Sequence, residues 1–487
     1  MFLRVADIVN RLKLDTDYIS SGNCVDYSPV NGKEIASFPF HDSEYVKTVV
    51  ERSQKAFGEW KEVAPRFRSE LIRLFGEELR ANTDDLAQLI VIETGKIYAD
   101  ALIEVQKSIA VCEYASGLPQ RLSSISAPTE STNLSILETW LPIGPVAVVS
   151  SFNFPLRVWV LNAMLAIACG DSVVWRPSRK AMLTAFAANT LLRRAMARTR
   201  ADCPEYLTQF VTCGHDEAAV LAGSPDIALL CATGSPVMAR NLVAKVGMRL
   251  GRSLLSLGGN NAAIVTPSAD IPLAVEHLIR STVVDGGQRC TSLQRLFCHS
   301  SVYAEVVGRL KDGLQRIYVN SPFERRSEIS PLIDREAHDS MRLSLDQAQI
   351  EGGVVSGGER LMIGNYDNAY YVHPALVEMP SQTPTVRTEL LAPVLFVMSY
   401  DHLDDAVARI NEVPQTLISC IFSNSVQETG YFSSLDGVMS GVATVNAGSV
   451  GYDLVAIFSG ERNSGGSGSE PWRSYMRSKT CLVNYNF

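Results

Sequence analysis

The sequence predicts an α/β protein built from two successive blocks, each with a parallel sheet whose faces are covered by helices. From about residue 146 to 445, short apolar runs alternate with segments of helical periodicity. The chain has 487 residues, which is enough for roughly three domains at ~150 residues each. Apolar residues make up 46% and charged residues 20%, as in ordinary soluble globular proteins.

The elements of the first block follow from local patterns. Residues 1–40 hold short strand-like pieces with turn residues, such as YSPVNGKEIASFPF. From residue 42 to about 118, apolar residues recur every three to four positions, which predicts helices. After residue 146, the strand-like runs VAVVSS, DSVVWRP, IALLC and RSLLSLGG alternate with helical segments. This alternation predicts a parallel sheet, because parallel neighbours need a crossover connection.

The second block runs from about residue 260 to 445. Its predicted strands are NAAIVT, RLFCH, PALVEM, PVLFVMSY, ISCIFS and GVATVN, with helices such as DIPLAVEHLIRSTV and LDDAVARINEV between them. The Gly- and Ser-rich segment 459–471 predicts a loop. The last piece, TCLVNYN, resembles a strand, and we expect its open edge to pair with another subunit.

Charge and cysteine usage restrict the class of partner and compartment. The net charge of −8 disfavours nucleic acid and anionic membranes as main partners. No apolar run reaches ~18 residues, and the first 15 residues lack the apolar core of a signal peptide. The ten cysteines include no CxxC or zinc-ribbon spacing, so we predict no metal site. We expect mostly buried thiols in a reducing compartment, most simply the cytoplasm.

Cys290 is the candidate nucleophile. It stands in VVDGGQRCTSLQRLF, where two glycines and Arg289 precede the thiol and Thr-Ser follows it. This pattern predicts a thiol at the start of a helix, where the helix N-terminus and the guanidinium would both favour the thiolate. The alternative is a buried structural cysteine.

Two further motifs contain polar groups at predicted strand ends. Asn153 lies in SFNFP, where its amide could donate to a developing oxyanion or could cap the helix after Pro155. The segment ATGSP (232–236) follows a strand and opens a helix, a turn that suits a pyrophosphate. The alternative there is that Ser235 only caps the helix.

Charged side chains offer contacts for a nucleotide. Arg176 ends the strand VVW, and Arg179 and Lys180 follow it, so these cations could hold ribose or phosphate oxygens or could line a solvated turn. Glu389, in RTELLAP, could accept hydrogen bonds from ribose hydroxyls.

Together and in this order, the motifs resemble the aldehyde dehydrogenase superfamily over nearly the whole chain. They are SFNFP, WRPS, ATGSP, LGGNN, GGQRCT, ELLAP and the Gly-rich segment near the end. The segments GQRCTSLQRLF and SGSEPWRSYMRSKTCLVNY are most similar to the aminoadipic semialdehyde (antiquitin-like) dehydrogenase branch. Each motif alone is weak, but the ordered set is highly specific.

The resemblance implies an oxidoreductase that uses NAD or NADP to oxidise a small-molecule aldehyde. Cys290 would form a thiohemiacetal and then a thioester, with Asn153 and the Cys290 N–H as the oxyanion hole. The implied cofactor contacts are Arg176, Arg179, Ser235 and Glu389. Arg289 and Glu104 would bind the carboxylate and the amine of an amino-acid semialdehyde.

The resemblance also implies a three-part architecture. A doubly wound nucleotide-binding domain would consist of residues 1–122 and 142–252, and an α/β catalytic domain would consist of residues 253–450. A small β oligomerisation arm would join residues 123–141 to residues 478–487. Such an arm implies a homodimer or homotetramer.

The chain departs from the family pattern at its chemistry. The family's LELGG reads LSLGG, so Ser256 replaces the general-base Glu. The usual Gly-Arg-Glu near the end is absent, although Glu461 and Glu470 lie near that segment. On the cofactor side, Arg179 stands where NAD-preferring relatives often carry Glu. A cation at this position would tolerate or favour the 2′-phosphate of NADP. The other cofactor-side departures are Arg176, Ala232, Ala239 and Leu391.

Three hypotheses therefore stay open. The first is an NAD(P)-dependent aldehyde dehydrogenase whose deacylation is slow or uses another group. The second is thioester chemistry, in which the acyl group passes to coenzyme A or an acyl thioester is reduced. The third is a non-catalytic family member that acts as a binding or structural subunit. Binding of NAD, binding of NADP, and weak or no nucleotide binding also remain alternatives.

Overall fold

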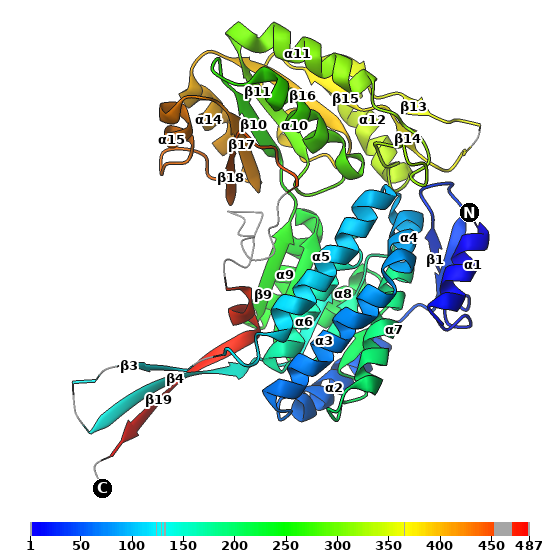
Figure 1. The fold of residues 1–487 in the computed structure, drawn as a ribbon, viewed down its shortest axis with the longest axis vertical. Coiled ribbons are helices and arrows are strands. Elements are labelled where there is room, and N and C mark those ends of the chain that lie inside the picture. Colours follow the sequence, from blue (N-terminus) through cyan, green and yellow to red (C-terminus); the bar gives the residue numbers. More distant parts are fainter. Residues whose placement is uncertain are drawn as a thin grey trace.

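A computed structural model of the chain describes residues 2–122, 124–127, 129–130, 133–364, 366–451 and 470–485. Figure 1 shows two α/β parts, one above the other, and a long β arm that extends from the lower part. The predicted α/β architecture with parallel sheets is confirmed. No helix in the described ranges is long and apolar enough to cross a membrane.

The lower part is built on a parallel five-stranded sheet of order β7-β6-β5-β8-β9. Numbered in chain order, the strands run 3-2-1-4-5 across the sheet. The sheet is therefore doubly wound, and its switch point lies between β5 and β8. The strands are β5 (Val146–Val149), β6 (Val173–Arg176), β7 (Thr208–Phe210), β8 (Leu229–Gly234) and β9 (Arg252–Leu257). The helices between them are α6 (Arg157–Cys169), α7 (Met182–Arg198), α8 (His215–Gly223) and α9 (Pro236–Met248).

The residues before this sheet form a short hairpin and five helices. The hairpin pairs β1 (Cys24–Tyr27) with β2 (Glu34–Phe38) in antiparallel fashion. The helices are α1 (Phe2–Arg11), α2 (Ser43–Trp60), α3 (Pro65–Ala81), α4 (Thr83–Thr94) and α5 (Tyr98–Ser116). The helical prediction for residues 42–118 is confirmed. The first 40 residues differ from the prediction of strands alone, because Val5, Ile8 and Leu12 bury one face of α1.

The upper part is built on a seven-stranded sheet of order β12-β15-β16-β11-β10-β17-β18, parallel except for the edge strand β12. The strands are β10 (Asn261–Val265), β11 (Leu293–His299), β12 (Val354–Gly357), β15 (Ala375–Glu378), β16 (Val394–Tyr400), β17 (Ile418–Phe422) and β18 (Val442–Val445). A small hairpin pairs β13 (Arg360–Leu361) with β14 (Tyr371–Val372). The helices are α10 (Ile271–Val283), η1 (Val284–Gly287), α11 (Ser300–Gln315), α12 (Arg335–Ile350), α13 (Pro384–Arg387), α14 (Leu403–Asn411) and α15 (Val426–Phe432).

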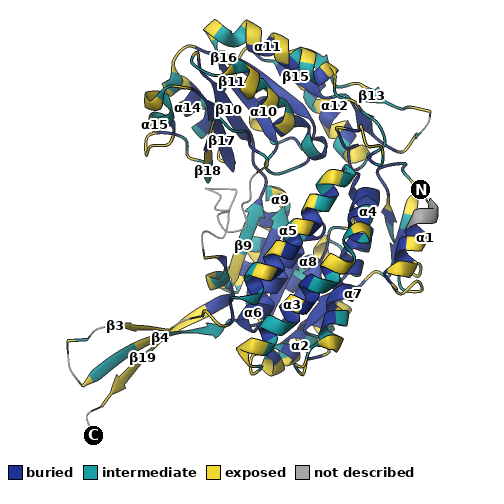
Figure 2. Ribbon diagram, in the orientation of Figure 1, coloured by how far each residue is buried: buried dark blue, intermediate teal, exposed yellow. Residues whose placement is uncertain are grey.

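The central strand β5 of the lower sheet is apolar throughout because both faces of that sheet are covered. In β5, Val146 and Val148 enter one core, whereas Ala147 and Val149 enter the core on the opposite face. Successive side chains of a strand point to opposite faces, so a strand between two helix layers needs an unbroken apolar run. Figure 2 shows the strands and the inner helix faces as buried.

The arm is a three-stranded antiparallel sheet of order β19-β4-β3. Its strands are β3 (Ile125–Ala127), β4 (Leu134–Pro142) and β19 (Met476–Asn484), and η2 (Pro471–Tyr475) leads into β19. Figure 2 shows much of the arm as exposed, and β19 lies at its edge. The predicted final strand is confirmed, but its pairing with another subunit stays a prediction.

Two sequence-derived details fall differently in the structure. β9 pairs with β8 up to Leu257, so the five-stranded sheet extends past the predicted domain boundary at residue 252. Arg252–Leu257 leads into β10 without a helix between them, and the division of the chain into domains stays a prediction. Most of the predicted loop 459–471, with Glu461, lies outside the described residues, whereas Glu470 pairs with Arg473 at 2.7 Å.

Candidate active site

The predicted site residues gather where two sheet edges meet. Asn153 follows β5, Arg176 ends β6, Ser235 follows β8 and Ser256 lies near the end of β9. Because these strands are parallel, their carboxyl ends share one edge, and ligands of doubly wound sheets bind at that edge. In the upper sheet, Cys290 precedes β11 and Glu389 precedes β16, so both stand at its opposite, amino edge.

Asn153 joins the two edges. Its side-chain Nδ2 donates to the carbonyl of Gln288 at 2.8 Å, in the turn that carries Cys290. Ser151 donates to the other side of the amide, Oδ1, at 2.6 Å and so fixes its orientation. The residue does not cap α6, whose N-cap is Leu156. An amide nitrogen carries two N–H donors, so donation to Gln288 leaves a second donor for an oxyanion.

Cys290 lies in a turn between η1 and β11 and not at the start of a helix, so that part of the prediction is wrong. The segment that follows the thiol is the strand Leu293–His299, which agrees with the predicted strand RLFCH. The Cys290 carbonyl accepts a hydrogen bond from Asn261 Nδ2 at 2.8 Å. This contact fixes the turn.

The electrostatic surroundings of Cys290 also differ from the prediction. Burial raises the pKa of the thiol to about 11, and the nearby Glu389 carboxylate adds to the rise. Arg289 and Arg157 act in the opposite direction but do not prevail. The protein alone therefore holds a thiol at neutral pH, and the predicted preference for thiolate is wrong for this state.

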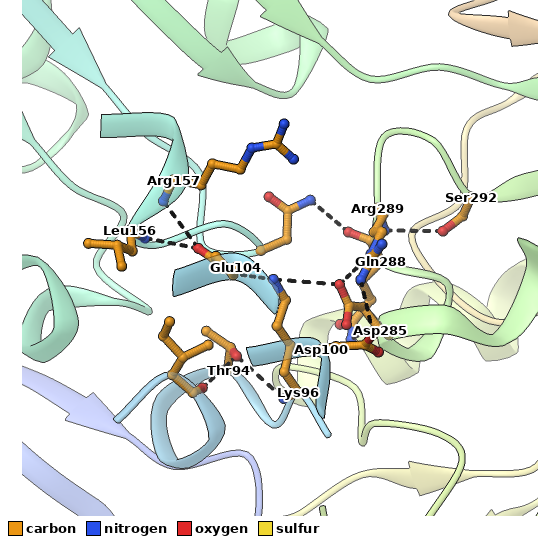
Figure 3. Close-up of polar contacts among 12 residues, drawn as sticks. Thr94, Lys96, Asp100, Glu104, Leu156, Arg157, Asp285, Gln288, Arg289 and Ser292 are labelled. Atoms are coloured by element: carbon orange, nitrogen blue, oxygen red, sulfur yellow. Dashed lines mark hydrogen bonds and ion pairs between the residues drawn. The ribbon is translucent and has the colours of Figure 1, made fainter. Parts of the chain in front are cut away.

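Arg289 belongs to a buried network of charges that lies beside Cys290 (Figure 3). Its Nε donates to Asp285 at 2.5 Å, and its Nη2 lies 3.8 Å from Asp100. Burial alone would lower the pKa of Arg289, but these two carboxylates raise it. Burial opposes ionisation of Asp285, yet Arg289 and Lys96 hold its pKa below the ordinary value.

Glu104 lies at the other end of this network. Its carboxylate contacts Lys96 and accepts hydrogen bonds from the N–H groups of Leu156 and Arg157 at 3.0 and 3.2 Å (Figure 3). The side chains of Lys96 and Glu104 are at most 2% exposed. Glu104 thus stabilises the start of α6 by accepting its otherwise unpaired N–H groups. This contact set is that of a structural carboxylate and differs from the predicted contact with a substrate amine.

The sequence reasoning missed Lys96, Asp100 and Asp285. Asp100 and Glu104 are spaced four residues apart in the first turns of α5, so a helical projection places them on one face, and Lys96 lies just before the helix. Asp285 was visible as a lone charge in VVDGGQ. The signal became meaningful only when the fold brought the two segments together.

The cofactor-side residues occupy the same sheet edge. Arg176 is buried, and its Nη2 donates to the Cys213 carbonyl at 3.2 Å. Burial lowers its pKa, and its Nε meets no acceptor among the described residues. A buried donor without a partner is costly, so an oxygen of a bound nucleotide would satisfy it.

Ser235 is the N-cap of α9 and accepts from the Met238 N–H at 3.3 Å. The capping alternative is thus observed, and the N-terminus of this 13-residue helix also suits a phosphate. Arg179 is exposed, whereas Lys180 pairs with Asp334 at 2.5 Å. These features fit a nicotinamide dinucleotide.

Ser256 and Glu389 lie at the junction of the two sheets. Ser256 lies on β9, where it pairs with Thr233 of β8, two positions before the Gly258–Gly259 turn. Glu389 Oε1 accepts the Gly259 N–H at 3.1 Å, and burial raises the pKa of Glu389 to about 7. No three His, Cys, Asp or Glu side chains of the described chain gather as a metal site.

Comparisons with known proteins agree with this geometry. A family model described as "Aldehyde dehydrogenase family" matches residues 18–481. The alpha-aminoadipic semialdehyde dehydrogenase of Bos taurus is 32% identical over 466 residues, which cover 94% of this chain and 85% of that protein. A putative aldehyde dehydrogenase family 7 member A1 homolog of Caenorhabditis elegans is 32% identical over 476 residues, with coverage of 96% and 89%.

Solved structures show the same fold. Betaine aldehyde dehydrogenase of Staphylococcus aureus, crystallised in complex with NAD+, superposes with a TM-score of 0.92 at 21% identity, over 99% of this chain and 98% of that chain. A 3,6-anhydro-L-galactose dehydrogenase superposes with a TM-score of 0.89 at 24% identity, over 96% and 98%. The predicted fold, family and branch are confirmed. The chain belongs to the aldehyde dehydrogenase family of NAD(P)-dependent enzymes.

Proposed function

We propose that this chain oxidises a small-molecule aldehyde with NAD or NADP through a covalent intermediate on Cys290. The observation that carries the proposal is the hydrogen bond from Asn153 to Gln288, which brings the oxyanion donor to the turn of the nucleophile. The expected division of labour follows the predicted domains, with nucleotide binding on residues 1–122 and 142–252 and catalysis on residues 253–450.

Cys290 and Asn153 perform the first step. The Cys290 thiolate attacks the aldehyde carbon, and the second N–H of Asn153 and the Cys290 backbone N–H stabilise the oxyanion of the thiohemiacetal. When bound, NAD or NADP supplies the hydride acceptor. Arg176 and Glu389 would orient its ribose groups, and the N-terminus of α9 with Ser235 would hold its pyrophosphate. The product of oxidation is a thioester on Cys290.

The second step, hydrolysis of the thioester, lacks its usual group. Ser256 occupies the position of the family's general-base Glu, and a serine hydroxyl takes no proton at neutral pH without its own base. Loss of a positioned base costs on the order of 10²–10⁴-fold in rate. We therefore expect slow deacylation unless another carboxylate or coenzyme A resolves the thioester.

The substrate class proposed is an amino-acid semialdehyde, in line with the family branch. Arg289 remains the candidate partner of the substrate carboxylate, although Asp285 and Asp100 already neutralise it. A carboxylate would have to compete with Asp285 for the guanidinium, and this competition predicts weaker binding of acidic aldehydes than an unpaired arginine would give. Glu104 is omitted from this proposal because its carboxylate already contacts Lys96 and two backbone N–H groups.

We further propose that Arg179 selects NADP. It is exposed beside Arg176 at the end of β6, where a 2′-phosphate could contact it. The β arm would join two copies of this chain into a homodimer or a homotetramer. All ten cysteines are free, which suits a reducing compartment such as the cytoplasm.

Stopped-flow absorbance of the reduced nicotinamide tests the proposal. The protein is mixed with aminoadipic semialdehyde or a medium-chain aldehyde, with NAD or NADP, with and without coenzyme A. A burst near one equivalent per subunit followed by slow turnover supports acylation of Cys290 with impaired hydrolysis. Acceleration by coenzyme A supports the thioester alternative. No burst and no nucleotide binding would contradict catalysis and favour a binding or structural subunit.

A further inference from the structure

Glu389 lies on the Gly258–Gly259 turn. It follows α13 and precedes β16, and its Oε1 accepts the Gly259 N–H at 3.1 Å. A Cβ atom built at Gly258 would lie 2.0 Å from both carboxylate oxygens. Residue 258 therefore has to be glycine for the carboxylate to occupy this place.

The Cys290 turn contacts the same dipeptide. A Cβ atom built at Gly259 would lie 3.2 Å from the Cys290 carbonyl oxygen, which Asn261 holds at 2.8 Å. The Glu389 carboxylate is also the strongest charge acting on the thiol, because its negative charge raises the pKa of Cys290 next after burial does. The Glu389 carboxylate and the backbone of the Cys290 turn thus meet at the Gly258–Gly259 turn, which follows Ser256 at the carboxyl end of β9.

Among the described residues, Glu389 differs from the other carboxylates near Cys290 because no cation pairs with it. Asp285 is paired with Arg289 and Lys96, and Glu104 contacts Lys96. No lysine or arginine of the described residues forms an ion pair with Glu389. An acceptor-only group without a cation keeps its basicity, and burial raises the pKa of Glu389 to about 7.

We propose that Glu389 is the proton acceptor that hydrolyses the Cys290 thioester, in place of the carboxylate that position 256 lacks. The inference rests on the proposed function and assigns the step which that function leaves without a base. Glu389 takes a proton from water, and the water oxygen forms a bond to the thioester carbon. The carbon–sulfur bond then breaks, the acid leaves, and the proton on Glu389 passes to the Cys290 thiolate.

This role alternates with the one that the family resemblance gives to Glu389. Hydrogen bonds from ribose hydroxyls would lower the basicity of the carboxylate, and the bound ribose would keep water away from it. Deacylation should therefore follow release of the reduced nucleotide. Added NADH or NADPH should prolong the lifetime of the acyl-enzyme, which mass spectrometry of the intact protein measures directly.

The test uses p-nitrophenyl acetate without any nucleotide. The burst of p-nitrophenol reports acylation of Cys290, and the following steady rate reports deacylation. For Glu389→Gln we expect a retained burst and a deacylation rate lower by on the order of 10²-fold or more. Glu305→Gln is the matched control, because Glu305 is half exposed on α11 in a pair with Arg309, and it should behave as the wild type.

The pH profile of the wild type gives a second readout. A base must be deprotonated to act, so deacylation should rise with pH through about 7 and then level off. Glu389→Gln should lose this inflection. In the Glu389→Gln background, Ser256→Glu should restore deacylation, because it supplies a carboxylate to the same turn.

The inference would be overturned if Glu389→Gln deacylated at the wild-type rate, or if the wild-type pH profile showed no inflection near pH 7. Loss of the burst in a folded Glu389→Gln would also overturn it, since the residue would then act on acylation. The ester experiment is independent of nicotinamide. If the protein does not oxidise aldehydes but its ester turnover depends on Glu389, only the proposed function is removed. If it oxidises aldehydes but deacylation does not depend on Glu389, only this inference is removed.

Discussion

Arg289 Nε lies 2.5 Å from Asp285 Oδ2, so the cation next to the nucleophile is already paired within the protein. The Asp285 side chain is 3% exposed and also lies 3.6 Å from Lys96. The charge that the resemblance assigns to substrate recognition is therefore shared between the protein's own carboxylates and a prospective ligand. The pairing of Arg289 with Asp285 should therefore affect the stability of the protein, its choice of substrate and the reactivity of Cys290.

Asp285→Asn should separate these effects. Asparagine tolerates the positive φ of 51° at this position, so the change removes charge without adding backbone strain. Leaving two buried cations short of one partner should cost roughly 3–5 kcal/mol in the free energy of unfolding, measured by urea denaturation. The freed Arg289 should lower the KM for acidic aldehydes. Asp346→Asn, at an exposed position of α12, is the control, and equal stability of both variants would contradict the expectation.

Cys290→Ala should abolish the burst and all turnover with aldehydes. Alanine has no nucleophile, so neither the thiohemiacetal nor the thioester can form. The check is stopped-flow absorbance together with a thermal melt that shows an intact fold. Persistent oxidation in the folded variant would remove the covalent mechanism.

Ser256→Glu should accelerate steady turnover while leaving the burst amplitude unchanged. The substitution returns a carboxylate to the end of β9, where water could reach it, and a positioned base contributes on the order of 10²–10⁴-fold. The comparison is made at saturating aldehyde and nucleotide, with Ser256→Ala as the variant that adds no base. Unchanged turnover, with cofactor binding retained, would show that hydrolysis is not the limiting defect.

The rate of acylation should depend on pH differently from deacylation. With the pKa of Cys290 raised to about 11, the thiolate fraction grows about tenfold per pH unit between neutrality and pH 10. The burst rate with p-nitrophenyl acetate should rise accordingly with no plateau below pH 10. A burst rate that is flat above pH 7 would mean that the thiol ionises far more readily than its burial implies.

Leu482→Asp should weaken association of the chain. Leu482 lies on the edge strand β19 with 63% of its surface exposed, and a buried aspartate at a subunit contact has no partner. Light scattering after size exclusion should show a smaller species than the wild type gives. The matched substitution Leu435→Asp, at a fully exposed position of the upper part, should change nothing. An unaltered mass for Leu482→Asp would locate the oligomer interface elsewhere.

Most of the fold was predictable because its signals are local. The fully apolar run of β5 follows from burial on both faces, and the helical period of α2 and α3 follows from burial on one. The exceptions have local causes as well. α1 lies among turn residues that obscure its pattern. The strand RLFCH after Cys290 is predicted from the sequence, and only the helix start expected at the thiol is not observed.

The site was predictable in its members but not in their pairings. Cys290 and Asn153 could be found because each lies in a short motif, and the structure joins their segments through Gln288. Glu104 carried the residue type expected of an amine ligand, yet the fold uses it to hold Lys96 and the start of α6. A motif specifies a side chain, whereas the contacts of that side chain depend on which other segments approach it.

The sequence by itself determined the order of most strands and helices, the family, the candidate nucleophile and the absence of a glutamate at position 256. Only the tertiary structure decided that Asp285 neutralises Arg289 and that Glu389 stands beside the Cys290 turn. Glu389 and Gly259 are 130 positions apart in the chain, yet their atoms lie 3.1 Å apart. Electrostatic effects depend on the distance between charges and on burial, and neither quantity exists until the two sheets have met.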